Sequence, residues 1–247
     1  MGQGERLDVA MVGRGLAPTR SRARDLIVRG LVSVDGVASA KPAFLVREGS
    51  SVAVRGEDAF AASRGGLKLK AALAAYGFDP AGITALDVGA STGGFTELLL
   101  ARGASKVYAV DVGRDQLHPR LKADPRVVSL EGQDSRTLNR VLIPDAIMGI
   151  VVDVSFISLK KALPAALALA APGAWLAALV KPQFEVGRDG VGKGGIVRDD
   201  ALRIQAVAEI AAWLKDDMGW QVLPALVSPI AGGSGNTEYL IGAIRIA

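Results

Sequence analysis

The fold of this chain is constrained most by residues 85–100, which read ALDVGASTGGFTELLL. An apolar, strand-like run over residues 83–88 leads into a loop of glycines and small hydroxyl residues, and an amphipathic helical pattern follows. Glycines let a loop adopt positive φ angles and approach a ligand closely, and the first turn of a helix offers unpaired N–H groups. The stretch therefore predicts a nucleotide-binding turn between a strand and a helix.

A second strand-like run, residues 106–110, ends in Asp111, about twenty residues after Gly89. A carboxylate at this spacing can accept hydrogen bonds from two ribose hydroxyls. The loop lacks the middle glycine of the dinucleotide fingerprint, which normally admits a pyrophosphate, because Ser91 stands there. We expect a nucleoside ligand without a pyrophosphate, with a dinucleotide ligand and a merely structural turn as the alternatives.

Composition indicates a globular protein with one domain of ordinary size and a small one. The chain has 247 residues, of which 50% are hydrophobic and 22% charged, and it has no cysteine, which excludes disulfides and thiol nucleophiles. Residues 1–70 contain 12 Lys and Arg against 7 Asp and Glu, whereas residues 71–247 contain 17 against 18. A basic module joined to a neutral one predicts that the first binds a polyanion and the second performs chemistry.

Residues 163–180 form an uncharged run that could suggest a membrane span. Pro164, Pro172 and Gly173 divide it, so we expect a short helix and a short strand of a buried core instead. The first residues have no apolar signal region. We therefore expect a cytoplasmic protein without a membrane partner.

Residues 1–55 have the pattern of a small module. We expect a helix over residues 6–12, a second helix capped by Thr19 and ending near Arg29, and strands broken at residues 35–36 and 49–50. The segment SRARDLIVRGLVSVDG resembles the core of the S4 RNA-binding domain. That resemblance implies phosphate contacts from arginines, against the alternative of an ordinary solvated basic helix. The candidates are Arg6, Arg14, Arg20, Arg22, Arg24 and Arg29.

Residues 56–64 read as a linker, and residues 65–247 read as an α/β domain in which strands and helices alternate. Helices are expected from residue 63 to about 76 and over 94–102, 158–171 and 199–215. Strands are expected over 83–88, 106–110, 127–130, 147–152, 174–180, 220–228 and 238–246, the last two antiparallel. Such a sheet binds ligands at the carboxyl ends of its strands.

Four charged residues stand at the ends of these elements. Asp153 and Lys181 follow apolar strands, Glu238 opens the last strand, and Lys68 lies at the start of the first helix of the domain. A charge at the end of an apolar strand is poorly placed for plain solvation, although it can simply reach water. We expect the four to converge on the sheet edge that carries the glycine loop.

The motifs SRGGLKL, LDVGASTGGFT, DVSFISL, KPQFE, GIVRD and SGNTEYL follow the S4-like segment in this order. Together they resemble the TlyA (hemolysin-like) family of ribosomal RNA 2′-O-methyltransferases, whose catalytic half is similar to the FtsJ (RrmJ) fold. The resemblance implies a Rossmann-like class I methyltransferase with a mostly parallel, seven-stranded sheet behind a small α+β S4 domain. It also implies that S-adenosylmethionine is the methyl donor and that ribosomal RNA or a ribosomal subunit is the partner. Because the chain is short for this family, we expect a cytidine of the large-subunit RNA as the target.

The resemblance also implies the site residues. The catalytic tetrad falls on Lys68, Asp153, Lys181 and Glu238. The donor site falls on Asp87, Gly89, Ala90, Ser91, Thr92, Gly93, Gly94 and Phe95, with Asp111 at the ribose and Asp134 near the adenine.

Methyl transfer to a ribose hydroxyl needs an aligned nucleophile and a general base. We assign the base to Lys181, with Lys68 and Glu238 orienting the groups around it. A free lysine is protonated at neutral pH. Burial and the nearby cation Lys68 would lower the pKa of Lys181, whereas Asp153 and Glu238 would raise it, so the balance of these effects must be arranged. No metal is required, and the single histidine, His118, is expected at the surface.

Two loops and three other functions stay open at this point. Residues 187–198 could form a mobile lid that contacts RNA, and residues 228–236 could line the target pocket, unless both are ordinary connections. The other functions are a nicotinamide-dependent oxidoreductase, a non-catalytic RNA-binding assembly factor and a pore-forming toxin.

Overall fold

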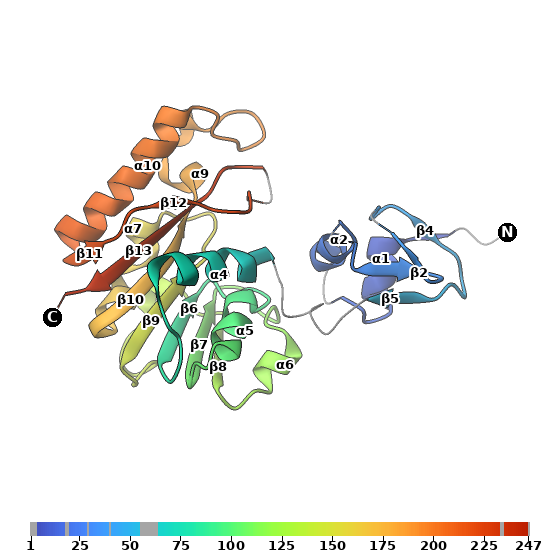
Figure 1. The fold of residues 1–247 in the computed structure, drawn as a ribbon, viewed down its shortest axis with the longest axis horizontal. Coiled ribbons are helices and arrows are strands. Elements are labelled where there is room, and N and C mark those ends of the chain that lie inside the picture. Colours follow the sequence, from blue (N-terminus) through green and yellow to red (C-terminus); the bar gives the residue numbers. More distant parts are fainter. Residues whose placement is uncertain are drawn as a thin grey trace. The chain divides into compact units, whose positions relative to one another are not determined.

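The chain forms two compact units in the computed structural model, Met1–Arg64 and Gly65–Ala247 (Figure 1). The structure describes residues 4–17, 20–28, 30–39, 41–54, 64–232 and 235–246. Thr19, Arg29 and all of the expected linker except Arg64 lie outside these residues. Each unit has its own core and is described by itself.

The first unit packs two helices against short antiparallel strands. The helices are α1 (Leu7–Gly13) and α2 (Arg20–Val28), and the strands are β1 (Glu5–Arg6), β2 (Val32–Val34), β3 (Val37–Ala38), β4 (Leu45–Val46) and β5 (Val52–Val54). Buried Leu7, Met11 and Ile27 belong to one apolar cluster, which gives this small unit a core of its own. The hairpin between β2 and β3 turns at Asp35 and Gly36, both with positive φ, as the Asp-Gly pair predicts.

The second unit is built on a mostly parallel sheet with the order β11-β13-β10-β9-β6-β7-β8. Strands β6 to β10 pair in parallel, and β13 pairs antiparallel with β10, β11 and β12. From β6 the chain moves outward through β7 and β8, and it returns to the other side of β6 with β9. Ligands bind at such a reversal, at the carboxyl ends of the strands. The strands are β6 (Thr84–Val88), β7 (Lys106–Asp111), β8 (Val127–Glu131), β9 (Ile147–Val152), β10 (Ala170–Val180), β11 (Trp220–Val222), β12 (Leu226–Val227) and β13 (Tyr239–Arg245).

Helices cover both faces of this sheet (Figure 1). On one face α4 (Arg64–Tyr76) and α5 (Gly94–Ala101) bury Leu69 and Leu99, and on the other α8 (Pro164–Ala168) and α10 (Asp200–Ala212) bury Leu167 and Ile210. The remaining helical segments are α6 (Pro119–Lys122), α7 (Leu159–Ala162), α9 (Pro182–Glu185), η1 (Ser135–Thr137), η2 (Arg188–Gly190) and the π-helical turn η3 (Trp213–Asp217). The unit therefore has three layers.

Two predicted elements are wrong in their extent, and proline is the cause in both. The helix expected over residues 158–171 is two short helices that meet at Pro164, and β10 already begins at Ala170. Proline has no N–H to continue a helix and suits the first position of a new one. The strand expected over residues 220–228 is divided into β11 and β12 around Pro224. Among the described residues the sheet consequently has eight strands rather than seven.

The uncharged run of residues 163–180 provides α8 and β10, whose side chains fill the core of the second unit. In the part of the chain that the structure describes, no helix combines the length and the apolar character that crossing a bilayer requires.

Candidate functional site

The strand register aligns four functional positions along the carboxyl edge of the sheet. Val152 pairs with Val88 on one side and with Ala178 on the other, and Val180 pairs with Tyr239. The residues that adjoin these pairs are Gly89, Asp153, Lys181 and Glu238. Charged side chains thus lie beside the glycine loop at the point where the order of the sheet reverses.

The four predicted catalytic residues form two ion pairs. Lys68 Nζ, from α4, donates to Glu238 Oε2 at 2.5 Å, and Lys181 Nζ lies 2.5 Å from Asp153 Oδ1. The ammonium group of Lys181 also donates to Ser155 Oγ at 2.9 Å. Lys68, Lys181 and Glu238 are buried, and a buried charge is tolerated only when it is paired. The structure thus places both ion pairs at the same edge of the sheet, and three of the four residues are buried.

The glycine loop packs directly against the end of β9. Gly89 has a φ of +88°, and a Cβ atom there would lie 2.7 Å from the carbonyl oxygen of Asp153. The N–H groups of Gly89 and Ala90 both donate to the carbonyl oxygen of Val110, and Gly93, with a φ of +98°, leads into α5. Only a residue without a side chain fits at position 89, so the loop holds its backbone close to the cavity described next.

A cavity of about 500 Å³ opens between this loop and the ends of β7, β8 and β9. Among the predicted donor-binding residues, Gly89, Ser91, Asp111 and Asp134 line it. Asp153 lines it as well, so the cavity and the Lys181 ion pair share one carboxylate. The predicted residues Asp87, Ala90, Thr92, Gly93, Gly94 and Phe95 are not in the cavity wall and build the loop from behind.

Asp111 is fixed by the backbone at the end of β7. Its Oδ2 accepts a hydrogen bond from Ser91 N at 2.8 Å, and its Oδ1 accepts one from Gly113 N at 2.7 Å. A carboxylate oxygen has two lone pairs, so both oxygens can still accept a hydroxyl. The arrangement suits recognition of a ribose.

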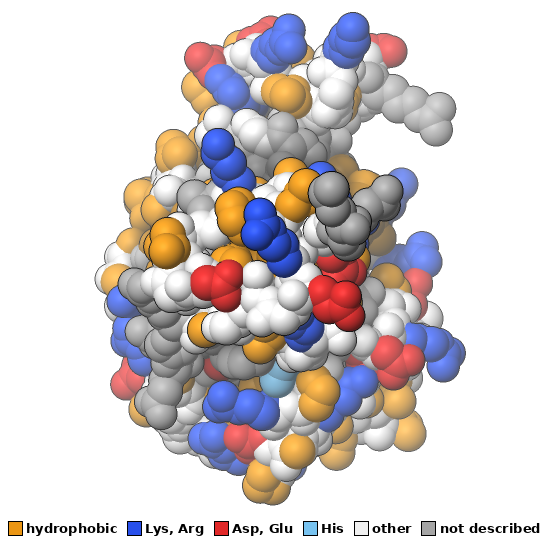
Figure 2. All heavy atoms as spheres, turned by 90° about the vertical axis from the view of Figure 1, so that its right-hand side faces the viewer, with side chains coloured by type: hydrophobic (Ala, Val, Ile, Leu, Met, Phe, Trp, Pro, Cys, Tyr) orange, Lys and Arg blue, Asp and Glu red, His pale blue; other side chains and the backbone are white. Residues whose placement is uncertain are grey.

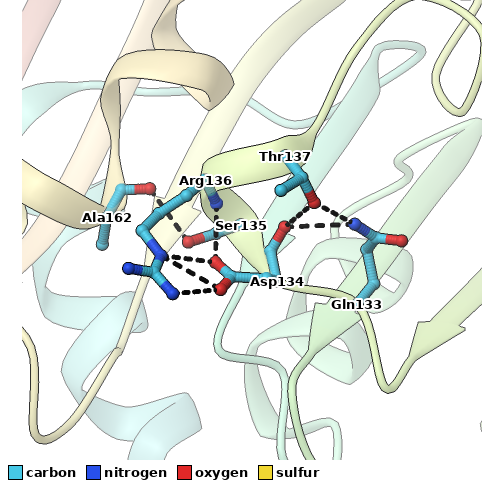
Figure 3. A network of polar contacts seen from close by, with 6 residues as sticks. All are labelled: Gln133, Asp134, Ser135, Arg136, Thr137 and Ala162. Carbon is cyan, nitrogen blue, oxygen red and sulfur yellow. Dashed lines mark hydrogen bonds and ion pairs between the residues drawn. The ribbon is translucent and has the colours of Figure 1, made fainter.

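Asp134 caps the turn η1 at the other side of the cavity (Figure 3). Its Oδ1 accepts from Arg136 N at 2.9 Å, and its Oδ2 lies 2.5 Å from the guanidinium of Arg136, which lowers the pKa of this carboxyl group. Gln133 donates to the Asp134 carbonyl oxygen and to Thr137 Oγ1, while Ser135 Oγ donates to the carbonyl oxygen of Ala162. These hydrogen bonds fix the turn as one side of the cavity, and the carboxylate of Asp134 is held there in an ion pair with Arg136.

Asp87 lies behind the loop and is fully buried. Its Oδ2 accepts a hydrogen bond from Thr96 Oγ1 at 2.7 Å, whereas its Oδ1 has no partner. Burial raises the pKa of Asp87 to about 7; the Thr96 hydrogen bond opposes this shift, and the nearby Asp153 adds to it. The environment of Asp87 therefore favours its protonated form over a wider pH range than that of a free carboxyl group.

Sequence reasoning missed several residues of the cavity wall, above all Phe156. Its side chain is 91% exposed, its φ is +66°, and its ring centroid lies 5.2 Å from that of Phe184. Gln133, Arg136 and Ser155 were also missed. The motif DVSFISL contains Phe156, but no periodicity indicates that this ring points outward.

Buried Asn236 connects the two loops of uncertain role, residues 187–198 and 228–236. Its Oδ1 accepts from Val197 N at 2.9 Å, and its Nδ2 donates to the carbonyl oxygen of Gly195 at 2.8 Å. The end of the 187–198 segment is thus anchored to the segment that leads into Glu238.

In the first unit, three of the predicted RNA-binding arginines meet at one carboxylate. Arg6, Arg20 and Arg24 all bond Asp8, while Arg14 donates to the carbonyl oxygen of Ser50. The side chain of Arg22 and the whole of Arg29 lie outside what the structure describes.

His118 is half-buried and caps α6, its Nδ1 accepting from Arg120 N. The described residues contain no group of three side chains suited to a metal ion.

Two family models match the chain. The model of FtsJ-like methyltransferases matches residues 61–245, and that of the S4 domain matches residues 5–52. A Mycobacterium tuberculosis protein named 16S/23S rRNA (cytidine-2′-O)-methyltransferase TlyA is 46% identical over 246 residues, which cover 98% of this chain and 90% of that protein. Hemolysin A of Brachyspira hyodysenteriae is 40% identical over 236 residues, 95% of this chain and 98% of that protein.

Solved structures agree with this. A protein of Streptococcus thermophilus that carries a hemolysin name has a TM-score of 0.78 at 39% identity, over 99% of this chain and 89% of that chain. The N-methyltransferase NodS of Bradyrhizobium japonicum has a TM-score of 0.50 at 15% identity, over 74% of this chain and 95% of that chain, and shows the shared fold alone. The methyltransferase fold expected from the sequence, behind an S4 domain, is confirmed.

Proposed function

The chain belongs to the family of FtsJ-like methyltransferases with an S4 domain, and on this premise we propose that it methylates the 2′-hydroxyl of a cytidine in ribosomal RNA. The observation that carries the proposal is the presence of two ion pairs, Lys68–Glu238 and Lys181–Asp153, at the sheet edge, the second of which borders the cavity. The Mycobacterium tuberculosis relative that is 46% identical is named as a cytidine-2′-O-methyltransferase of 16S and 23S rRNA.

S-adenosylmethionine is the proposed donor, and it supplies a methyl group activated by a sulfonium. The cavity fits a nucleoside: Gly89 leaves no room for a side chain at the loop, and Asp111 presents oriented carboxylate oxygens. Gly89 and Ser91 would hold the donor from the loop, and Asp111 would bind the ribose. The wall formed by residues 133–136 would border the adenine.

The chain's own residues would align and deprotonate the RNA hydroxyl. In its neutral form, Lys181 would take the hydroxyl proton on Nζ as the hydroxyl oxygen bonds to the methyl carbon and the bond from that carbon to the donor sulfur breaks. Asp153 and Ser155 hold that Nζ in place. The pair formed by Lys68 of α4 and Glu238, which directly precedes β13, would orient the target ribose of the RNA. The S4 domain would capture the structured RNA through phosphate contacts, and that substrate places the protein in the cytoplasm.

The alternatives have less support. A dinucleotide would need the middle glycine, which Ser91 replaces. An assembly factor without catalysis would not need the two ion pairs of Lys68, Glu238, Lys181 and Asp153. The alternative of a pore-forming toxin is suggested only by the name hemolysin, which relatives carry and which says nothing about the activity of this chain.

The test replaces Lys181 by arginine in the full chain. Arg keeps the positive charge but cannot lose its proton, so methyl transfer to ribosomal RNA should fall by at least about 100-fold. Donor affinity, measured by calorimetry, should change by less than about twofold. Lys161→Arg, an exposed lysine on α7, is the matched control and should keep full activity. Equal incorporation of labelled methyl groups by the wild type and Lys181→Arg would sink the role of Lys181.

The target is found by mapping 2′-O-methyl groups in both ribosomal RNAs from cells with and without the gene. We expect the change at a cytidine of the large-subunit RNA. A second change in the small-subunit RNA would correct the expectation of a single substrate, and no change in either RNA would contradict the proposed function.

A further inference from the structure

Asp8 is a buried carboxylate at the junction of three elements of the first unit. It lies in the first turn of α1 and is 0% exposed. Arg6, from β1, donates to it through Nε at 3.0 Å and through a terminal nitrogen at 3.2 Å. From α2, Arg20 donates a terminal N–H at 3.2 Å, and Arg24 donates its Nε–H at 2.8 Å. One anion thus holds three cations that sequence reasoning had assigned separately to RNA.

The charge balance of this cluster is unusual for a structural ion pair. Hydrogen bonds from the three arginines hold the pKa of Asp8 well below its ordinary value, so one negative charge faces three positive ones. The arginine side chains remain 42%, 53% and 53% exposed. An arginine has five N–H donors, so the bonds to Asp8 engage only part of each fork. The cluster is a fixed concentration of positive charge at the surface.

On the face shown in Figure 2, basic side chains are interspersed with acidic ones rather than gathered in one continuous patch. A mixed surface of this kind produces little attraction at a distance, whereas a local cluster of like charges attracts a phosphate backbone.

We propose that Asp8 is a positioning residue that assembles Arg6, Arg20 and Arg24 into one site for the phosphodiester backbone of RNA. This inference rests on the function proposed above. Three guanidinium groups repel one another, and the shared carboxylate holds them together before RNA arrives. Binding then avoids the entropic cost of ordering three long side chains.

The substitution Asp8→Asn distinguishes assembly of the three arginines by Asp8 from an effect of net charge alone. The substitution raises the net charge of a basic unit by one, which alone predicts tighter binding of RNA. If Asp8 assembles the arginines, the same substitution should weaken binding by about tenfold or more, because the three side chains separate. Glu48→Gln is the matched control: it makes the same charge change at an exposed residue of the same unit and should leave affinity equal or higher.

The measurement uses the full chain and purified large ribosomal subunits that lack the modification. Asp8→Asn should raise the KM for subunits and leave kcat and the donor KM within about twofold. Arg20→Gln and Arg24→Gln should each weaken binding more than Arg47→Gln, a change at another exposed arginine. In the double variant Arg20→Gln/Arg24→Gln, adding Asp8→Asn should have less effect than it has in the wild type.

These outcomes decide the inference even if Asp8→Asn folds poorly, because the arginine variants leave Asp8 in place. Subunit binding by Asp8→Asn as tight as by Glu48→Gln overturns it, and so does equality of the Arg20, Arg24 and Arg47 variants. A wild type that binds subunits but transfers no methyl group contradicts the proposed function and leaves the test of Asp8 intact. A wild type that does not bind subunits overturns both.

Discussion

Two buried carboxylates, Asp8 and Asp87, have surroundings that shift their pKa values in opposite directions. Asp8 is surrounded by three arginines and stays ionised, whereas Asp87 has one hydroxyl partner and an unpartnered oxygen, which favours its protonated form. Burial alone therefore does not define the role of an acid. The partners of the acid decide whether it stays ionised and binds cations, as Asp8 does, or tends to keep its proton, as Asp87 does behind the glycine loop.

Asp87 should make the stability of the second unit depend on pH. The unfolded chain loses this proton above about pH 4, whereas the folded protein keeps it up to about pH 7, since the pKa is raised to about 7. The folded state binds more protons across that window, so this residue lowers stability as the pH rises.

Asp87→Asn removes this dependence. The substitution should stabilise the unit by about 3 kcal/mol more at pH 8 than at pH 5, as measured by urea unfolding. Asp216→Asn, at an exposed residue of η3, should show no such difference. Equal effects of Asp87→Asn at the two pH values would mean that Asp87 is ionised throughout.

At the scale of elements, the glycine loop, for which we propose donor binding, depends on one close contact. Gly89 combines a positive φ with a backbone oxygen 2.7 Å from the position of a Cβ atom, whereas Gly77, after α4, has a φ of +68° and open space. Comparing an alanine substitution at each glycine therefore distinguishes the cost of a positive φ, which both share, from the cost of the close contact, which only Gly89 has.

Gly89→Ala should weaken S-adenosylmethionine binding by at least about tenfold, because the loop must move away from Asp153. Gly77→Ala carries only the backbone cost of about 1–2 kcal/mol and should leave donor affinity within about twofold. Calorimetry with each variant measures both. Similar donor affinities for the two variants would show that the close contact is unimportant for the loop.

Elements with long apolar or helical patterns could be predicted from the sequence, and irregular ones could not. The strands over residues 84–88 and 147–152 were found because continuous apolar runs mark buried parallel strands. Pro164 and Pro224 were visible, yet their effect on the extent of the surrounding elements was missed. The outward ring of Phe156 depends on one positive φ, which no pattern of residue types specifies.

The sites show the same division. The ends of the strands could be expected to bring Asp153, Lys181 and Glu238 to one edge, because parallel and antiparallel register fixes that geometry. The meeting of Arg20 and Arg24 with Asp8 depends on how α1 packs against α2, and helical spacing says nothing about that partner.

At the scale of the molecule, the two units have cores made of different residues. Leu7, Met11 and Ile27 belong to the first, whereas the apolar residues beneath the donor loop belong to the second. RNA capture is proposed for one unit and methyl transfer for the other, so the two binding steps should be energetically independent.

Arg24→Gln and Asp111→Asn test this independence. Arg24→Gln should weaken subunit binding and leave donor affinity within about twofold. Asp111→Asn should weaken the donor by about tenfold or more, since an amide cannot accept both backbone N–H groups that the carboxylate accepts, and it should not change subunit binding.

In the double variant, the two effects on binding free energy should add to within about 0.5 kcal/mol. Calorimetry with S-adenosylmethionine and filter binding of labelled subunits give the four affinities for the cycle. A coupling above about 1 kcal/mol would mean that RNA held by the S4 domain changes the affinity for S-adenosylmethionine, because independent sites do not couple to that extent. Additivity would instead assign affinity for RNA to the first unit and chemistry to the second.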